Sequence, residues 1–372
     1  MSRCKLEEFI SYEQPSKYIV NSDQYDDSFE IPVLTAGKSF ILGYTDETNN
    51  IFDNLPVIIF DDFTTSVQFV DFPFKVKSSA MKLLKNTEQA DIKYCYYLLK
   101  YLQHTPENHK RQWLSTTSQK TVELPVIEEQ KNIVSKLDKI LEVIDNQNKQ
   151  LELLDEAIKA RFVEMFGDPM INPYEWKVIN ISEVLRAKAS NGFFSRRDDY
   201  CDDGNVKVLG VANVVNRMYS QVVDLPRTNA NEKDIEKFEV KYGDMLFCRS
   251  SLVAEGIGKA SIIPEGVQTN ILFECHVIRL PLDLDKCVPE FLQTLSTTKF
   301  FRNQIISKSK TATMTTIGQD GILKTNIILP PLEKQKEYYN FVKQIDKSRS
   351  RIQKSLEASQ ELFDSLMQEY FG

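Results

Sequence analysis

The sequence predicts an α+β protein in which two similar globular domains are separated by two long helices, packed as an antiparallel coiled coil with a pseudo-two-fold repeat. The first observation is an eight-residue box that occurs twice, as LPVIEEQK at 124–131 and as LPPLEKQK at 329–336. The second is heptad spacing after each box. The third is a constant register: 124 corresponds to 329 and 167 to 372, an offset of 205 residues at both ends.

Each copy of the box predicts the start of a helix about 55–60 Å long. Pro125 and Pro330 suit the first helical position, where no backbone N–H is needed. Gly167 predicts a left-handed residue that closes the first helix. Apolar residues recur at steps of three, four and seven, which is the spacing of a coiled-coil seam. The residues expected to pair the helices are Leu137, Ile140, Ile144, Leu151, Leu154 and Ile158 in the first copy, and Val342, Ile345, Ile352, Leu356 and Phe363 in the second.

Polar residues interrupt both seams near the middle. Gln147 and Asn148 do so in the first helix, and Arg349 does so in the second. These residues indicate either a solvated face with a slight bend, or polar core positions that fix register and orientation. An antiparallel arrangement would bring the two polar segments together. Charge reversal at Arg349 is therefore expected to affect helix pairing or assembly, and not the choice of target.

The helices divide the chain into a domain at 1–122, a helix at 123–167, a second domain at 168–327 and a second helix at 328–372. A net charge of −7 argues against a protein that coats nucleic acid indiscriminately, although it permits a local basic face. Six cysteines without CxxC spacing are typical of reduced thiols. No signal-peptide core or membrane-spanning run is found, so a cytoplasmic protein without membrane contact is expected.

The two globular domains follow the same plan. In the first, strands are expected at 31–34, 57–60, 69–70 and 72–77, with a helix at 92–102. In the second, strands are expected at 206–209, 244–247, 261–263 and 276–278, with a helix at 289–295. A polar loop follows the second strand in each domain, and a polar stretch precedes each box. The pattern indicates two α+β domains of common ancestry with different loops.

No catalytic constellation emerges from the sequence. Segments 36–39 and 256–259 resemble fragments of phosphate-binding loops but lack the spacing that would cradle a phosphate. Asn172-Pro173-Tyr174 is interpreted as a turn, and the three histidines are too dispersed for a metal cluster. The acidic pairs at 61–62 and 198–199 could bind a cation, but no lysine follows at nuclease spacing. We therefore predict no catalytic residue, no metal ligand and no cofactor in this chain.

The polar loops contain residue types that contact DNA. Arginine and lysine neutralise phosphates or bind guanine, amides pair with adenine, and threonine methyls touch thymine. The candidate DNA-binding residues of the first domain are Lys38, Asp62, Thr64, Thr65, Lys75, Lys77, Ser78 and Arg111. Those of the second are Arg196, Arg197, Asn213, Asn216, Arg217, Arg249, Ser250, Lys259, Lys310 and Thr313.

The chain resembles the specificity (S) subunit of type I restriction–modification systems throughout its length. The doubled box at 124–131 and 329–336 carries the resemblance most strongly. Segments 32–38, 241–247 and 256–263 are similar to this family's target-recognition domains. The resemblance implies two such domains, each reading one half of a split site in double-stranded DNA, and a coiled coil that acts as spacer and dock.

The resemblance also implies partners that carry the chemistry. Two methyltransferase (M) subunits would use S-adenosylmethionine to methylate adenine at N6, and two restriction (R) subunits would use ATP and magnesium. This chain would be a non-catalytic DNA-binding subunit of the restriction system. Base-contacting residues cannot be transferred, because the loops diverge within the family. Two alternatives remain open: a coiled-coil scaffold that binds other proteins, and a metal-dependent nuclease built on the acidic pairs.

Overall fold

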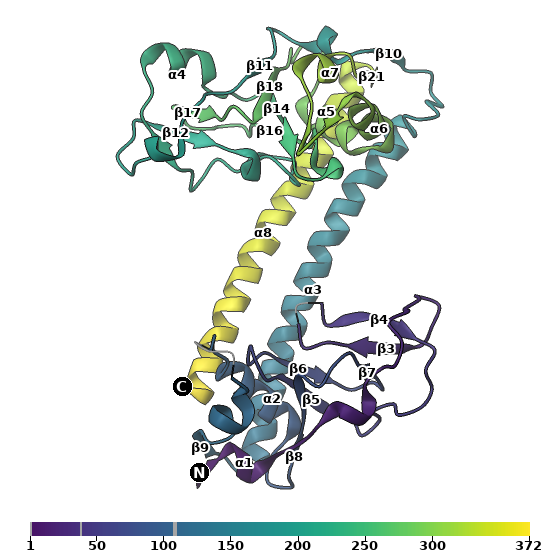
Figure 1. Ribbon diagram of the computed structural model, residues 1–372. Coiled ribbons are helices and arrows are strands. Elements are labelled where there is room, and N and C mark those ends of the chain that lie inside the picture. The colour runs from purple at the N-terminus through teal and green to yellow at the C-terminus, as the bar shows by residue number, and fades with distance from the viewer. Residues whose placement is uncertain (1, 38, 107–109) are drawn as a thin grey trace. The chain divides into compact units, whose positions relative to one another are not determined.

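The computed structural model describes residues 2–37, 39–106 and 110–372, and the chain divides into two compact units (Figure 1). Unit 1 comprises Met1–Lys149 and Gln353–Gly372, and unit 2 comprises Gln150–Ile352. Each unit therefore contains one globular domain, one end of the first long helix and the opposite end of the second.

The main sheet has the same strand order in both units. In unit 1 it is β2-β8-β5-β6, and in unit 2 it is β11-β18-β14-β16, with antiparallel neighbours throughout. The central strands β5 and β14 are buried along their whole length, as their apolar sequences predict. The bounds are β2 Ile10–Glu13, β5 Val57–Asp61, β6 Val67–Val70, β8 Met81–Asn86, β11 Ser190–Asn191, β14 Asp244–Cys248, β16 Ala260–Ile262 and β18 Val277–Pro281.

A second, three-stranded sheet is also duplicated. Its order is β4-β3-β7 in unit 1 and β13-β12-β17 in unit 2, with one antiparallel and one parallel neighbour in each case. A two-stranded antiparallel pair, β1-β9 or β10-β21, leads into each long helix. The bounds are β1 Ser2–Lys5, β3 Ile31–Leu34, β4 Ile41–Thr45, β7 Lys75–Val76, β9 Thr121–Leu124, β10 Lys177–Asn180, β12 Val206–Leu209, β13 Arg227–Thr228, β17 Ile271–Phe273 and β21 Asn326–Leu329.

The two long helices, α3 (Ile127–Phe166) and α8 (Leu332–Phe371), have 40 residues each and run antiparallel within each unit. In unit 1, the Lys136 ammonium donates to the Tyr370 hydroxyl and the Gln147 amide donates to Ser355. In unit 2, the Arg349 guanidinium contacts Asp155. Residue numbers rise along one helix as they fall along its partner, which confirms the predicted antiparallel coiled coil.

The expected helix starts need correction. Both helices begin two residues later than predicted, because the carbonyls of Val126 and Pro331 accept the first helical hydrogen bonds. The box prolines before them therefore lie outside the helices. At the other end, Gly167 has a φ of +76°, the left-handed conformation that was predicted for it.

The polar residues in the middle of each helix find a partner on the other helix within their own unit. Gln147 pairs with Ser355 at 2.8 Å, whereas Arg349 pairs with Asp155 at 2.6 Å. All eleven residues expected to pair the helices are buried or half-buried. The buried ones are Leu137, Ile144, Ile158, Val342 and Phe363, and the half-buried ones are Ile140, Leu151, Leu154, Ile345, Ile352 and Leu356.

An identical joint ties each domain to the start of the long helix that follows it. The Gln130 amide is fully buried; its Oε1 accepts from the Asp91 backbone N–H at 2.8 Å and its Nε2 donates to the Pro125 carbonyl. Gln335, the corresponding residue of the second box, accepts from the Val288 N–H at 2.9 Å and donates to the Pro330 carbonyl. The glutamine of each box is therefore a structural residue.

The opposite helix ends insert aromatic rings into the same two cores. In unit 1, Phe371 of α8 packs on Tyr94 of α2 (Ile92–Tyr101), with ring centroids 5.3 Å apart. In unit 2, Phe166 of α3 packs on Phe291 of α5 (Pro289–Thr297) at 4.8 Å. Phe166 and Phe371 are 205 residues apart, so the repeat extends from sequence to packing.

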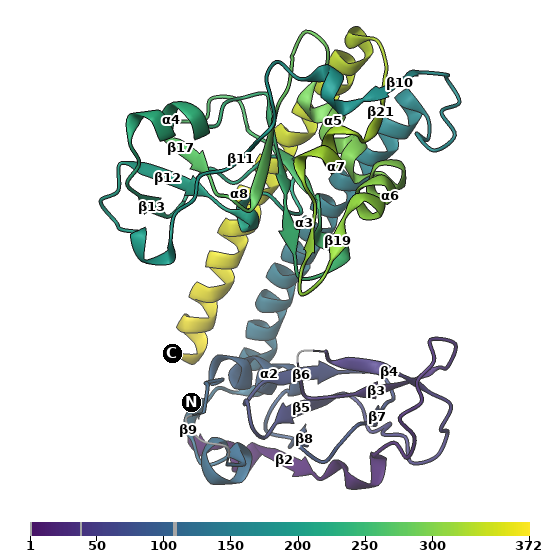
Figure 2. The same cartoon turned by 45° about the horizontal axis from the view of Figure 1, so that its top comes forward.

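Unit 2 carries elements beyond the common plan. Figure 2 shows α4 beside β12 and β17, and α5, α6 and α7 near α3 and α8. A small sheet, β15-β20-β19, extends from the segment after β14. The helix α5 was expected at 289–295 and is the counterpart of α2, whereas α4, α6, α7 and the small sheet were not expected. Their bounds are α4 Glu232–Phe238, α6 Lys299–Lys308, α7 Gln319–Leu323, β15 Ser250–Ser251, β19 Lys310–Thr311 and β20 Thr315–Thr316; unit 1 adds the short helix α1, Leu6–Phe9.

All six cysteines are free thiols. Cys95 lies in the core of unit 1 and Cys287 in the core of unit 2, both with no exposed surface. Burial raises the pKa of both thiols far above the ordinary value, because the thiolate would lose its hydration. Among the described residues, no helix has the length and apolar character needed to span a bilayer.

Candidate nucleic-acid interface

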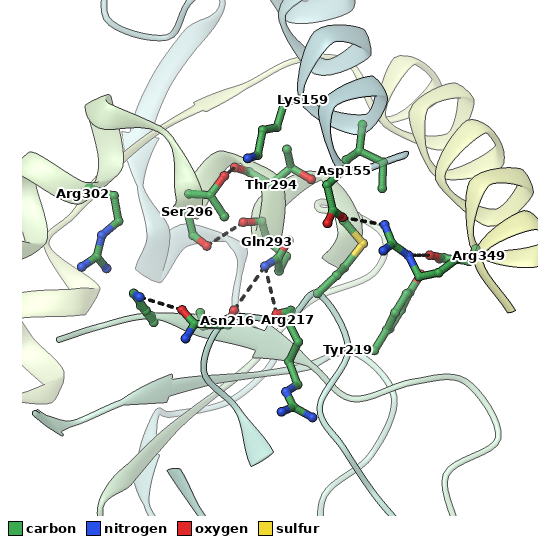
Figure 3. Close-up of a pocket in the computed structure, with 16 residues that line it drawn as sticks. Asp155, Lys159, Asn216, Arg217, Tyr219, Gln293, Thr294, Ser296, Arg302 and Arg349 are labelled. Carbon is green, nitrogen blue, oxygen red and sulfur yellow. Dashed lines mark hydrogen bonds and ion pairs between the residues drawn. The ribbon is translucent and has the colours of Figure 1, made fainter. Parts of the chain in front are cut away.

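A cavity of about 610 Å³ opens in unit 2 where α3, α5 and α8 approach the start of β16 (Figure 3). Asn216, Arg217 and Lys259, three of the residues proposed from sequence, line it. The Lys259 ammonium donates to Asn216 Oδ1 at 2.6 Å, so residues 43 positions apart share one rim. The loop that carries Asn216 is tied to β16 by backbone hydrogen bonds between Ile262 and its neighbours Met218 and Ser220.

The cavity is rich in cations. Lys159 from α3, Arg302 from α6 and Arg349 from α8 line it together with Arg217 and Lys259, against two carboxylates from Asp155 and Asp346. Arg302 Nη1 is buried without a hydrogen-bond partner among the described residues. Burial lowers the pKa of this guanidinium, because desolvation disfavours the charged form. An anion at this position would satisfy the free N–H groups.

Gln293 fixes one wall of the cavity. Its buried amide donates to the Arg217 carbonyl at 3.3 Å and to the Ala260 carbonyl at 3.2 Å. The Arg217 guanidinium itself bonds Gln221 at 3.0 Å and turns away from Gln293, as Figure 3 shows. The rim of the cavity is thus built by α5 and the 216–219 loop, and the guanidinium of Arg217 faces outward.

A second group of proposed residues gathers on the small sheet. Arg249 and Ser250 lie at the start of β15, and Lys310 and Thr313 lie in the β19–β20 hairpin. Ser250 pairs with Thr316 across the sheet, and the Ile317 N–H donates to the Arg249 carbonyl. Lys310 and Thr313 are exposed, while Arg249 and Ser250 are half-buried. The structure therefore brings these four residues to one small sheet, although they are about 60 positions apart in the sequence.

The remaining proposed residues of the second domain lie elsewhere. Asn213 Oδ1 accepts from the Gly210 N–H at 3.0 Å, so this side chain stabilises its own turn. Arg196 is exposed beside the short turn Arg197–Asp199, and only the backbone of Arg197 is described. Asn213 and Arg196 lie outside both the cavity and the small sheet.

Three of the proposed residues of the first domain are structural. Asp62 is 1% exposed, pairs with Lys82 at 3.3 Å and accepts from the Trp113 N–H at 2.9 Å. Thr65 is 2% exposed and donates to the His104 carbonyl. Lys75 is 1% exposed and pairs with Glu47. The three side chains were predicted to contact DNA, but in this structure they are buried and bonded to internal partners, so they present no surface to a duplex.

The other residues proposed in the first domain remain at or near the surface. Thr64, Ser78 and Arg111 are exposed, and Lys77 is half-buried and paired with Asp23. The Thr64 hydroxyl is 3.0 Å from that of Ser66. Lys38 lies outside the described residues. These surface positions keep their place as candidate DNA contacts of unit 1.

Sequence reasoning missed Lys159 and Arg302, which reach the cavity from two helices. Lys159 lies next to Ile158 of the helix seam, and nothing in the heptad pattern distinguishes it from other exposed lysines. Arg302 belongs to α6, which was not predicted. Among the described residues, no group of three or more histidine, cysteine or acidic side chains is placed to hold a metal ion.

Comparison with known proteins identifies relatives of this chain. The family model of the type I restriction modification DNA specificity domain matches residues 3–156 and 173–360. The specificity subunit of the type I restriction enzyme EcoR124I/EcoR124II from Escherichia coli is 46% identical over 146 residues, which is 38% of this chain and 36% of that protein. The MjaVIII specificity subunit from Methanocaldococcus jannaschii is 25% identical over 291 residues, which is 73% of this chain and 67% of that protein. The matched stretches thus span between about a third and two thirds of these relatives.

Solved structures show the same fold over the full chain. The S subunit of a type I restriction–modification system from M. genitalium aligns with a TM-score of 0.60 at 12% identity, covering 100% of this chain and 96% of that one. A structure described as showing complex assembly and conformational transition of the type I system aligns with a TM-score of 0.54 at 15% identity, covering 100% and 97%. Since the family model covers both domains and most of both long helices, the chain belongs to the type I restriction modification DNA specificity family.

Proposed function

We propose that this chain is a DNA specificity subunit that reads a bipartite site, with one half read by each domain. The observation that carries the proposal is the repeat: two domains with the same strand order, each joined by the same buried glutamine to a helix of the same length. Membership in the DNA specificity family supports DNA recognition as the class of function. Divergent surface loops on a common framework are what two readers of different sequences require.

The surface chemistry of unit 2 supports DNA as the ligand. The cavity rim and the small sheet together present Arg249, Lys259, Arg302 and Lys310, which suit phosphate oxygens, beside amides and hydroxyls that suit base edges. The net charge of −7 opposes non-specific binding to a polyanion. We therefore expect the chain alone to bind DNA weakly and partner subunits to supply much of the phosphate contact.

The proposal includes partners that perform the chemistry. Two methyltransferase subunits would dock on the exposed faces of α3 and α8, and restriction subunits would join through them. S-adenosylmethionine, ATP and magnesium would be used by those partners and not by this chain. Such an assembly would operate in the cytoplasm.

The test is selection of DNA by the assembled complex. The chain is co-purified with a methyltransferase subunit of a type I system and incubated with a random duplex library at about 150 mM salt, and bound sequences are determined. Two short conserved blocks separated by a fixed number of unconstrained base pairs are expected. Recovery of a random set of sequences would overturn the proposal.

A further inference from the structure

An exposed apolar group stands on the small sheet of unit 2. Leu252 is 83% exposed and Val253 59% exposed in the turn that follows β15, and Met314 is 37% exposed in the β19–β20 hairpin. Ser251 pairs with Thr315, so Leu252 and Met314 are the next residues along the two strands. We call Leu252, Val253 and Met314 the apolar tip.

The turn that carries the apolar tip is held in place. The Val253 N–H donates to Ser251 Oγ at 3.3 Å, and its carbonyl accepts from the Gly256 N–H at 3.1 Å. Arg302 Nη2 donates to the Glu255 carbonyl at 3.0 Å, which ties the turn to α6. A Cβ on Gly256 would lie 2.2 Å from Ser251 Oγ, so any other residue would displace this hydroxyl from its hydrogen bond with Val253. Because the turn is already fixed, its side chains lose little conformational entropy on binding.

Three basic residues lie on the segments that carry the apolar tip. Arg249 precedes β15, Lys259 ends the same connection between β14 and β16, and Lys310 starts the adjoining hairpin. The acidic side chain of this connection, Glu255, is exposed. The β19–β20 hairpin carries Met314 and is the two-stranded part of this sheet, and the major groove admits a two-stranded ribbon between its phosphates. In that groove the apolar feature is the C5-methyl of thymine.

We propose that Leu252 and Val253 are specificity-determining residues that pack on thymine methyl groups in the half-site read by the second domain. The inference rests on the proposed function and adds a chemical preference to it. Arg249, Lys259 and Lys310 hold the flanking phosphates and set the depth of the ribbon. The half-site read by unit 2 should then contain at least one thymine whose methyl group contributes to affinity.

The experiment compares variants in the complex with the methyltransferase partner. Wild type, the double variant L252S/V253S, the apolar variant L252M and the control Val223→Ser are each used in the library selection. Val223 is 60% exposed in the same unit but lies outside the apolar tip. The selected wild-type duplex is then tested with each thymine of both half-sites replaced in turn by deoxyuridine, which lacks only the methyl group.

In one half-site, replacing one or two of the thymines by deoxyuridine should lower the affinity of the complex for the duplex about fourfold. This is the effect of burying one methyl group. L252S/V253S should bind the thymine and deoxyuridine duplexes equally, whereas L252M and Val223→Ser should retain the wild-type difference. All variants should unfold at the same temperature, since the altered side chains are exposed.

Three results would overturn the inference. Wild type could be insensitive to every thymine methyl; L252S/V253S could retain the sensitivity; or the double variant could lose the methyltransferase partner, which would make the apolar tip a protein interface. In each of these cases a wild-type complex that still selects a bipartite site leaves the proposed function standing. A wild-type complex that selects nothing contradicts the proposed function itself.

Discussion

Glu290 in the first turn of α5 is 1% exposed, and the Tyr219 hydroxyl donates to its Oε1 at 3.3 Å. Its Oε2 has no partner among the described residues. Burial raises the pKa of this carboxyl to about 7 from an ordinary value of 4.5, because ionisation would place an unpaired charge in the core. The carboxyl group is therefore neutral in the folded protein at slightly acid pH, and its ionisation at alkaline pH destabilises the fold.

This shift gives unit 2 a pH-dependent stability. Between pH 4.5 and about 7 the unfolded chain loses the proton while the folded chain keeps it, so the contribution of Glu290 to stability falls as pH rises. Glu290→Gln removes that dependence. We expect the free energy of unfolding of the variant relative to wild type to increase by about 3 kcal/mol between pH 5 and pH 8. Urea titrations followed by Trp176 fluorescence measure it.

The exposed Glu236 of α4 provides the matched control. Glu236→Gln makes the same change of side chain at a solvent-exposed position of the same unit. A difference between Glu290→Gln and wild type that is equal at pH 5 and pH 8 would show that the folded protein ionises Glu290 at its ordinary pKa.

Residue type alone does not identify DNA contacts in the first domain. Asp62, Thr65 and Lys75 have the chemistry of DNA contacts and follow or form polar segments, but their partners are distant in sequence: Lys82, the His104 carbonyl and Glu47. Only the folded chain reveals these pairings. Asn216 and Lys259 could be proposed individually from sequence, but their mutual hydrogen bond depends on the pairing of the 216–219 loop with β16.

At the scale of elements, the long helices are the part of the fold that the sequence predicts best. Their apolar spacing is local, and the constant offset between copies requires no knowledge of tertiary structure. The strands of the small sheet β15-β20-β19 escaped prediction because each has two residues and no apolar period of its own. The helix α6 escaped prediction because only Phe301 and Ile305 of its ten residues are buried, and two apolar positions among polar ones are a weak helical signal. The position of these elements depends on packing against α5 and β14, which no local pattern encodes.

Substitutions at the ion pair between Asp155 and Arg349 can measure how much this pair contributes to the packing of α3 against α8 in unit 2. The side chains are 60% and 31% exposed, so solvent screens the pair and a coupling energy of up to about 1 kcal/mol is expected. Arg349→Glu should lower stability, since it faces Asp155 and Asp346. The reversed pair Asp155→Arg with Arg349→Glu should recover part of the loss in a double-mutant cycle measured by urea denaturation.

The DNA sequence selected by the complex should be unchanged in all three variants of this cycle. A change in the selected bases would mean that Arg349, which also lines the cavity, contributes to target choice. That result would contradict the assignment of Arg349 to helix pairing.

At the scale of the whole molecule, the repeat places the same joint at the base of each domain. Gln130 and Gln335 bind the domains through backbone groups of residues 91 and 288, so the side chains at these positions are free to differ. Asp91 and Val288 do differ, yet the hydrogen-bond lengths are 2.8 Å and 2.9 Å. A joint made of backbone groups tolerates divergence of the domain that it holds.

We therefore expect domains to be exchangeable between family members. Replacing residues 168–327 by the corresponding domain of another specificity subunit should change one half of the selected site and leave the other half intact. Library selection with the chimaeric complex measures this. A chimaera in which both halves change would contradict independent reading, and the reciprocal replacement of residues 1–122 serves as its control.

The buried thiols Cys95 and Cys287 are natural probes of how often each core opens to solvent. A disulfide reagent modifies such a sulfur only during a transient opening, so the modification rate of each cysteine reports the opening frequency of its own core. Peptide mass mapping distinguishes the two positions without any engineered label. Adding cognate DNA would then reveal, in one sample, which domain is slowed and by how much.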